Sequence, residues 1–141
     1  MRYLFSVISL FILLTACNKN KDDKKTLACG DVVNIDADKY QSDSSSYFLI
    51  DTAFINQNCL TITIGASGCD GSTWQTVLYD EGVVMDSYPI QRNIRFVLKN
   101  EELCLAVFSK TYSFDLQPTQ GTENKISFNL EGWNNALLYE Y

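Results

Sequence analysis

The chain has 141 residues, of which 46% are hydrophobic, and 11 basic against 17 acidic residues give it a formal net charge of −6. This length suits one domain with one hydrophobic core. The acidic balance argues against nucleic acid and against an anionic membrane surface as partners of the folded part. The lack of histidine excludes Ser-His-Asp and Cys-His catalysis and histidine-ligated metal centres.

The N-terminus has the order of a secretory signal, with a positive start at Arg2, an apolar stretch over residues 3–14 and small residues before Cys17. The stretch is shorter than the ~20 apolar residues that a membrane-spanning helix needs. Its ending, Leu14-Thr15-Ala16-Cys17, resembles the lipobox of bacterial lipoproteins. The resemblance implies that residues 1–16 are a cleaved signal peptide and that Cys17 carries the lipid. We therefore expect a protein anchored by lipid in the outer membrane. An ordinary signal peptide with an incidental cysteine is the alternative.

Residues 17–26 are expected to form a charged tether behind the lipid. Residues 18–25 include no apolar side chain and cannot contribute to a core. Within them, Lys21-Asp22-Asp23 is similar to the short lysine-plus-acidic export signal that some Gram-negative bacteria use for surface lipoproteins. The similarity implies display on the cell surface rather than on the periplasmic face. A plain spacer is the alternative.

The other four cysteines are Cys29, Cys59, Cys69 and Cys104, an even number that favours two disulfides in an exported protein. None of them forms a Cys-x-x-Cys pair, which disfavours a zinc site or a redox dithiol. Residues 60–65 are predicted to form a strand, which would separate Cys59 from Cys69 by roughly 20 Å. A disulfide needs Cα atoms within about 7 Å. Two pairings remain: Cys29–Cys59 with Cys69–Cys104, which we prefer, and Cys29–Cys69 with Cys59–Cys104.

Apolar residues recur with a period of two along most of the mature chain, which indicates strands with one buried and one exposed face. The segment 47–55 is more uniformly apolar and suggests a central strand. Turn signals separate the segments, among them 68–72, 80–82 and 132–135. The predicted strands are 47–55, 60–65, 73–79, 94–98, 103–107, 112–116, 126–130 and 136–141.

No segment of the mature chain shows a sustained period of 3.6 residues, so the pattern predicts an all-β fold. Short strands with turns every eight to twelve residues are typical of sandwiches and barrels. We predict that residues 27–141 form a single antiparallel β-sandwich, immunoglobulin-like in shape. A small up-and-down β-barrel is the alternative.

Short motifs in the body of the chain also occur in an order that resembles a group of small, uncharacterised bacterial lipoproteins. These have a cysteine before one strand and another in a later strand. The resemblance spans roughly residues 60–130, supports a bond between Cys69 and Cys104, and implies no activity. The motifs are Gly68-Cys69, Tyr88-Pro89-Ile90-Gln91, Glu102-Leu103-Cys104 and Ser113-Phe114-Asp115-Leu116.

Few residues suggest a ligand site. Asp36, Asp38 and Asp43 lack the spacing and the glycine of a calcium loop, so a solvated loop is expected. Trp74 and Trp133 are candidate binding aromatics, because exposed rings can stack on sugars or anchor partner proteins. The favoured interpretation is that both belong to the core or its rim. No metal or cofactor is predicted.

The sequence therefore predicts a non-enzymatic, lipid-anchored envelope protein that acts as a binding or accessory module for a protein or glycan partner. The alternative is a small inhibitor of an envelope or extracellular hydrolase, with loop 68–72 or loop 132–135 entering the cleft. An enzyme would need a pair of carboxylates in a cleft. The fold by itself does not decide between these functions.

Overall fold

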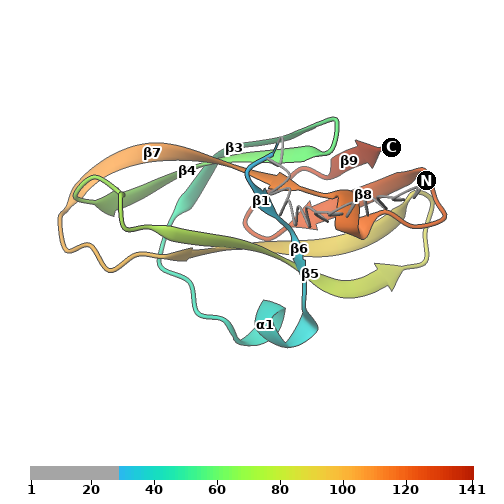
Figure 1. Cartoon of the computed structure of the whole chain (residues 1–141), viewed down its shortest axis with the longest axis horizontal. Helices are drawn as coiled ribbons and strands as arrows, with labels where there is room; N and C mark the ends of the chain where they lie inside the picture. The colour runs from blue at the N-terminus through green and yellow to red at the C-terminus, as the bar shows by residue number, and fades with distance from the viewer. Residues whose placement is uncertain (1–28) are drawn as a thin grey trace, which may run out of the picture.

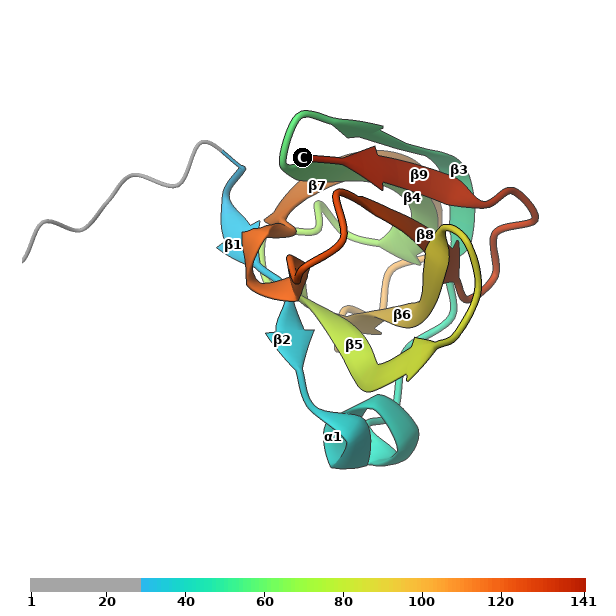
Figure 2. The same ribbon diagram turned by 90° about the vertical axis from the view of Figure 1, so that its right-hand side faces the viewer.

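The computed structural model describes residues 29–141, which form two β-sheets packed face to face around one core (Figures 1 and 2). One sheet has four strands in the order β1-β7-β4-β3, and the other has five in the order β2-β5-β6-β8-β9. The predicted all-β sandwich is confirmed. The elements are β1 (Asp31–Val32), β2 (Asn34–Ile35), α1 (Ala37–Ser42), β3 (Leu49–Asn56), β4 (Cys59–Gly68), β5 (Gln75–Met85), β6 (Ile90–Lys99), β7 (Ala106–Asp115), the 3-10 turn η1 (Gln117–Thr119), β8 (Lys125–Leu130) and β9 (Leu137–Glu140).

The sheets are mixed rather than wholly antiparallel. β1 pairs with β7, β2 with β5 and β6 with β8 in parallel, while the remaining pairs are antiparallel. Side chains alternate between the two faces of a strand in either direction, so the period-two pattern carries no information on strand direction. The short strands β1 and β2 take the chain from one sheet to the other. With two residues each, they are too short to show a period of two and were not predicted.

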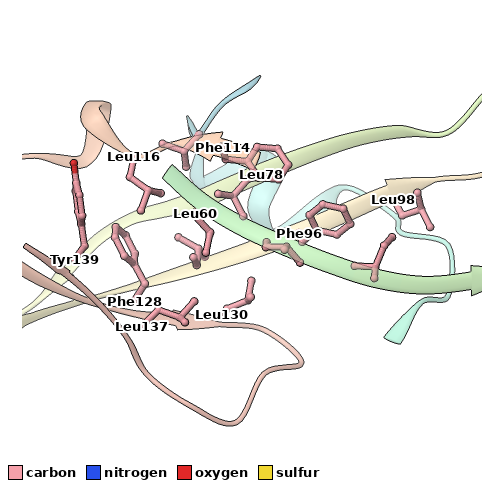
Figure 3. Close-up of a cluster of buried hydrophobic side chains, with 14 of the residues drawn as sticks. Leu60, Leu78, Phe96, Leu98, Phe114, Leu116, Phe128, Leu130, Leu137 and Tyr139 are labelled. Carbon is pink, nitrogen blue, oxygen red and sulfur yellow. The ribbon is translucent and has the colours of Figure 1, made fainter. Parts of the chain in front are cut away.

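The core is built from the inward-facing positions of both sheets (Figure 3). Along β4, Leu60, Ile62 and Ile64 are completely buried, and they alternate with partly exposed threonines. Burial of each such side chain stabilises the fold by about 1.5–3 kcal/mol. The core side chains of the opposite sheet include Leu78, Phe96, Leu98, Phe128 and Tyr139.

The expectation of a loop without helix around the three aspartates is wrong. Asp36 is the N-cap of α1, and its side chain accepts a hydrogen bond from the Lys39 N–H at 2.9 Å. Asp38 lies in the first turn of the helix, where a negative charge is favourable. The helix has six residues and no buried residue, so it produces no apolar stripe that a periodicity could reveal.

Two predicted strands and one predicted turn also differ from what is observed. The segment 47–55 forms β3, which lies at the edge of its sheet rather than in the centre. The turn predicted at 80–82 lies inside β5, where a register shift and the positive φ of Gly82 form a bulge. The strand predicted at 103–107 begins only at Ala106, and residues 101–105 belong to no strand. Residues 1–16, expected to be a signal peptide, Cys17 and the expected tether 17–26 with Lys21, Asp22 and Asp23 lie outside the described residues.

Candidate functional site

The two disulfides lie at opposite ends of β4. Cys29 is bonded to Cys59 and Cys69 to Cys104, which are the preferred pairs. β4 runs from the first disulfide to the second, and at ~3.3 Å per residue its length is about 30 Å. Because Cys29 is the first described residue, the chain from Cys17 enters at the Cys59 end. The loops at the far end, at the left of Figure 1, are here called the distal tip (residues 68–73 and 100–107).

The distal tip exposes three apolar side chains almost fully. The exposed fractions are 94% for Leu103, 90% for Leu105 and 75% for Val107. Leucine and valine are among the residue types most often buried, and here three of them are exposed on one segment. The three residues lie within five positions of one another, and Cys104 and Ala106 between them are also exposed, so apolar exposure is concentrated on this segment, here called the apolar ridge. Contiguous exposed apolar surface is typical of interaction sites.

Glu102 fixes this ridge to the neighbouring loop. Its Oε2 accepts hydrogen bonds from the N–H groups of Cys69, Asp70 and Gly71, the last two at 3.2 and 3.0 Å. Its Oε1 accepts from the Thr73 hydroxyl at 2.9 Å. One carboxylate thus satisfies three successive amides of loop 68–73, a nest of the kind that binds anions. The Cys69–Cys104 disulfide holds the same two segments two residues further along.

The charge state of Glu102 follows from these contacts. Partial burial acts to raise its pKa, but the N–H of Gly71, the Thr73 hydroxyl and the N–H groups of Cys69 and Asp70 together lower it from 4.5 to about 2. Hydrogen bonds to the charged form of a carboxyl favour ionisation. Glu102 is therefore an anion at any physiological pH, and the nest remains filled.

Two further side chains hold the tip from either side. Asn100 donates from Nδ2 to the Ser67 carbonyl at 2.7 Å, and its Oδ1 accepts from the Glu102 N–H at 2.9 Å. Lys110 donates to the carbonyl of Gly71. Gly71 has φ +67°, and a Cβ there would lie 2.9 Å from Lys110 Nζ. The tip is thus tied by side chains on both flanks, while its leucines stay free.

Both candidate tryptophans pack into the core instead of presenting free rings. Trp74 is 8% exposed and stacks on Phe108, with ring centroids 4.9 Å apart and an interplanar angle of 12°. Lys110 Nζ lies 5.6 Å from the centre of the same ring. Trp133 is partly buried against the core cluster. Trp74 lies directly below the tip and supports it from inside.

Other polar features of the described residues serve the fold. Asp80 is fully buried and forms a bidentate pair with Arg92 at 2.7 and 2.8 Å. A groove of about 410 Å³ runs past Tyr47 and Arg95. The Arg95 guanidinium already donates hydrogen bonds to two backbone carbonyls and forms an ion pair with Glu131. Within residues 29–141, no group of three or more acidic, cysteine or histidine side chains is placed to hold a metal ion. Over the same residues, no helix has the length and hydropathy needed to span a membrane.

No protein-family model and no curated protein matches the chain. Three solved structures share its fold. They are a protein of unknown function DUF1344 from Bacteroides vulgatus (11% identity, TM-score 0.53), a NigD-like immunity protein from Bacteroides caccae (10%, 0.56) and a putative toxin-related protein from Parabacteroides distasonis (11%, 0.52). The alignments cover 79%, 78% and 79% of this chain but only 56%, 58% and 61% of those proteins, respectively. At these identities the similarity shows the fold alone.

Proposed function

We propose that this chain is a lipid-anchored, non-enzymatic binding module of the bacterial envelope and that it contacts a protein partner through the distal tip. The observation that carries this proposal is the exposure of Leu103 and Leu105, 94% and 90%, on a segment tied down by a disulfide and a filled nest. A segment already fixed in one conformation loses little entropy when it binds.

The geometry favours a protein over a membrane or a glycan. The tip lies about 30 Å along β4 from Cys59, whose disulfide partner Cys29 is the point at which the chain from the tether enters the domain, so the tip is remote from the point of attachment. Its flanks carry the exposed carboxylates of Asp70 and Glu101, which an anionic bilayer would repel. Glycans commonly stack on exposed aromatic rings, but residues 68–73 and 100–107 include no aromatic side chain, and the exposed rings of Tyr47 and Tyr88 belong to other segments. Two neighbours of the same fold are named as an immunity protein and a toxin-related protein, and a protein-binding role is in line with those names.

Site-specific photo-crosslinking in living cells tests the proposal. A photoreactive amino acid replaces Leu103 in the full-length lipoprotein, and a second strain carries it at Leu138, a leucine on β9 that is 52% exposed. We expect a discrete adduct from position 103 that disappears when Leu105→Asp is added and persists when Leu138→Asp is added. Equal adducts from both positions, or none from position 103, would contradict the proposal.

The anchor is tested separately. Cys17→Ala should release the protein from the membrane fraction and abolish incorporation of labelled palmitate. Protease shaving of intact cells should degrade the wild-type protein, and Lys21→Ala/Asp22→Ala/Asp23→Ala should protect it. If wild type and variant are both protected, the tether is a spacer and the protein faces the periplasm.

A further inference from the structure

Residues 103–105 have the sequence pattern of a strand, but they pair with no strand of either sheet. Leu103, Leu105 and Val107 alternate with smaller residues, which is the pattern of a strand with one apolar face. β7 begins at Ala106, whose partner Gly68 is the last residue of β4. Nothing within residues 29–141 forms a backbone hydrogen bond with residues 103–105. The segment is therefore short of both a neighbouring strand and an apolar surface.

The cleft of a peptidase would supply both a neighbouring extended strand and an apolar surface. Endopeptidases hold a peptide by main-chain hydrogen bonds on either side of the scissile bond and take one side chain into a specificity pocket, which is an apolar slot in chymotrypsin. We propose that the distal tip is an inhibitory loop for an endopeptidase with an apolar specificity pocket, and that Leu103 occupies that pocket. The inference rests on the proposed function, because it names the class of protein that the tip binds.

The anchoring of the loop explains why it would inhibit rather than serve as a substrate. The residue before Leu103 is Glu102, tied to Cys69, Asp70, Gly71 and Thr73 by its carboxylate. The residue after Leu103 is Cys104, tied to Cys69 by the disulfide. Both ends of the Leu103–Cys104 peptide bond are therefore held on the same loop, by contacts that do not include that bond.

The chemistry of the trapped state follows from this arrangement. Attack by the peptidase nucleophile on the Leu103 carbonyl would form an acyl-enzyme, and the amino group of Cys104 would leave with one proton. An ordinary product amine then diffuses away, and water takes its place. Here the disulfide keeps the amine beside the ester or thioester, so that it attacks the same carbonyl, restores the peptide bond and frees the nucleophile. High local concentration of this kind favours the intramolecular reaction strongly.

Inhibition assays with two peptidases of opposite specificity test the inference. The probes are chymotrypsin, with its apolar pocket, and trypsin, whose pocket carries an aspartate. The protein is the mature domain from Cys17 onward with Cys17→Ser, with both internal disulfides formed. We expect inhibition of chymotrypsin and not of trypsin. Leu103→Ala should weaken it by about 10-fold to 100-fold. Leu138→Ala, the matched exposed leucine outside the tip, should leave the inhibition constant unchanged. Leu103→Lys should shift the inhibition from chymotrypsin to trypsin.

A second variant keeps the test decisive. Cys69→Ser/Cys104→Ser retains Leu103 but no longer holds the amine, so chymotrypsin should cut it at the 103–104 bond and release the enzyme. Its folding is checked by circular dichroism. The inference is overturned if the wild-type protein does not inhibit chymotrypsin at about 100 μM, or if Leu138→Ala weakens inhibition as much as Leu103→Ala. If the crosslinking experiment gives an adduct specific to the tip but the protein does not inhibit chymotrypsin, the peptidase is rejected as the partner. The proposed function, protein binding through the tip, then still holds.

Discussion

The two ends of the sandwich are each closed by a disulfide, but they are built in opposite ways. At the tether end, Cys29 is 4% exposed, and Phe114 and Leu116 beside it are almost completely buried. At the distal tip both cysteines are exposed, the leucines are exposed, and the ordering contacts are hydrogen bonds of Glu102 and Asn100. Beside its disulfide, the tether end is held by apolar packing, and the tip is held by side-chain hydrogen bonds. The tip can therefore keep its shape without covering its apolar side chains.

The largest contrast is expected from truncation of one apolar side chain at each end. Phe114→Ala removes a ring that is 1% exposed and should lower the free energy of unfolding by about 3–5 kcal/mol. Leu103→Ala removes a side chain without packing and should change it by no more than about 0.5 kcal/mol. Urea unfolding followed by tryptophan fluorescence measures both. A loss at Leu103 close to that at Phe114 would mean that the ridge is part of the fold.

The two disulfides give the next contrast. They close loops of similar sequence separation, 30 and 35 residues, so chain entropy predicts that loss of either one destabilises the fold by about 4 kcal/mol. Cys29→Ser/Cys59→Ser should cost more than this, because Cys29 is buried and the new hydroxyl replaces an apolar sulfur. Differential scanning calorimetry of the two double variants compares them directly. If Cys69→Ser/Cys104→Ser is the less stable variant, this prediction is wrong. The hydrogen bonds at the tip would then replace a lost disulfide less well than the contacts around Cys29 do.

A glycine at the tip gives a smaller effect. Gly71→Ala places a Cβ at φ +67° and 2.9 Å from Lys110 Nζ, which should cost about 1–2 kcal/mol. Gly121→Ala is the control, because a Cβ there meets no atom within 4 Å. The control should be neutral or stabilise by less than about 1 kcal/mol. Thermal melts of both variants test this, and a Gly71→Ala variant as stable as the control would show that loop 68–73 does not need its left-handed residue.

The sequence predicted those parts of the molecule in which burial dictates the pattern. β4 alternates because one of its faces is covered, and its length excluded a bond between Cys59 and Cys69. The prediction was wrong at 103–105, where the same alternation occurs without a sheet to cover it. It was also wrong at 80–82, because a glycine with positive φ can form a bulge inside a strand as well as a turn.

The candidate site was predicted only in part, because some of its contacts join residues that are far apart in the sequence. The cysteines and loop 68–72 were identified, since cysteine pairs and glycine turns have local signals. The role of Glu102 depends on three amides some thirty residues earlier in the chain. The available signal was a glutamate two residues before one cysteine of a pair, together with glycines on both sides of the other. Such a pattern indicates a nest only after the cysteine pairing is known.

The smallest expected effect concerns pH, which should distinguish the two ends in the wild-type protein. The pKa of Glu102 in the folded protein is lowered to about 2 by hydrogen bonds from Gly71, Thr73, Cys69 and Asp70, against 4.5 for a free side chain. Its contribution to stability is therefore fully present above about pH 4.5 and is lost as the pH falls through about 2. Amide hydrogen exchange at Gly71 should keep its protection, corrected for intrinsic rates, from pH 7 to pH 3. Below that range it should lose protection before the Leu116 amide, which donates to the Asn58 carbonyl near the tether end. In Glu102→Gln, which removes the charge, Gly71 should already exchange faster at pH 7, and its protection should no longer change near pH 2. Loss of protection at both amides together would mean that the tip opens only when the whole sandwich unfolds.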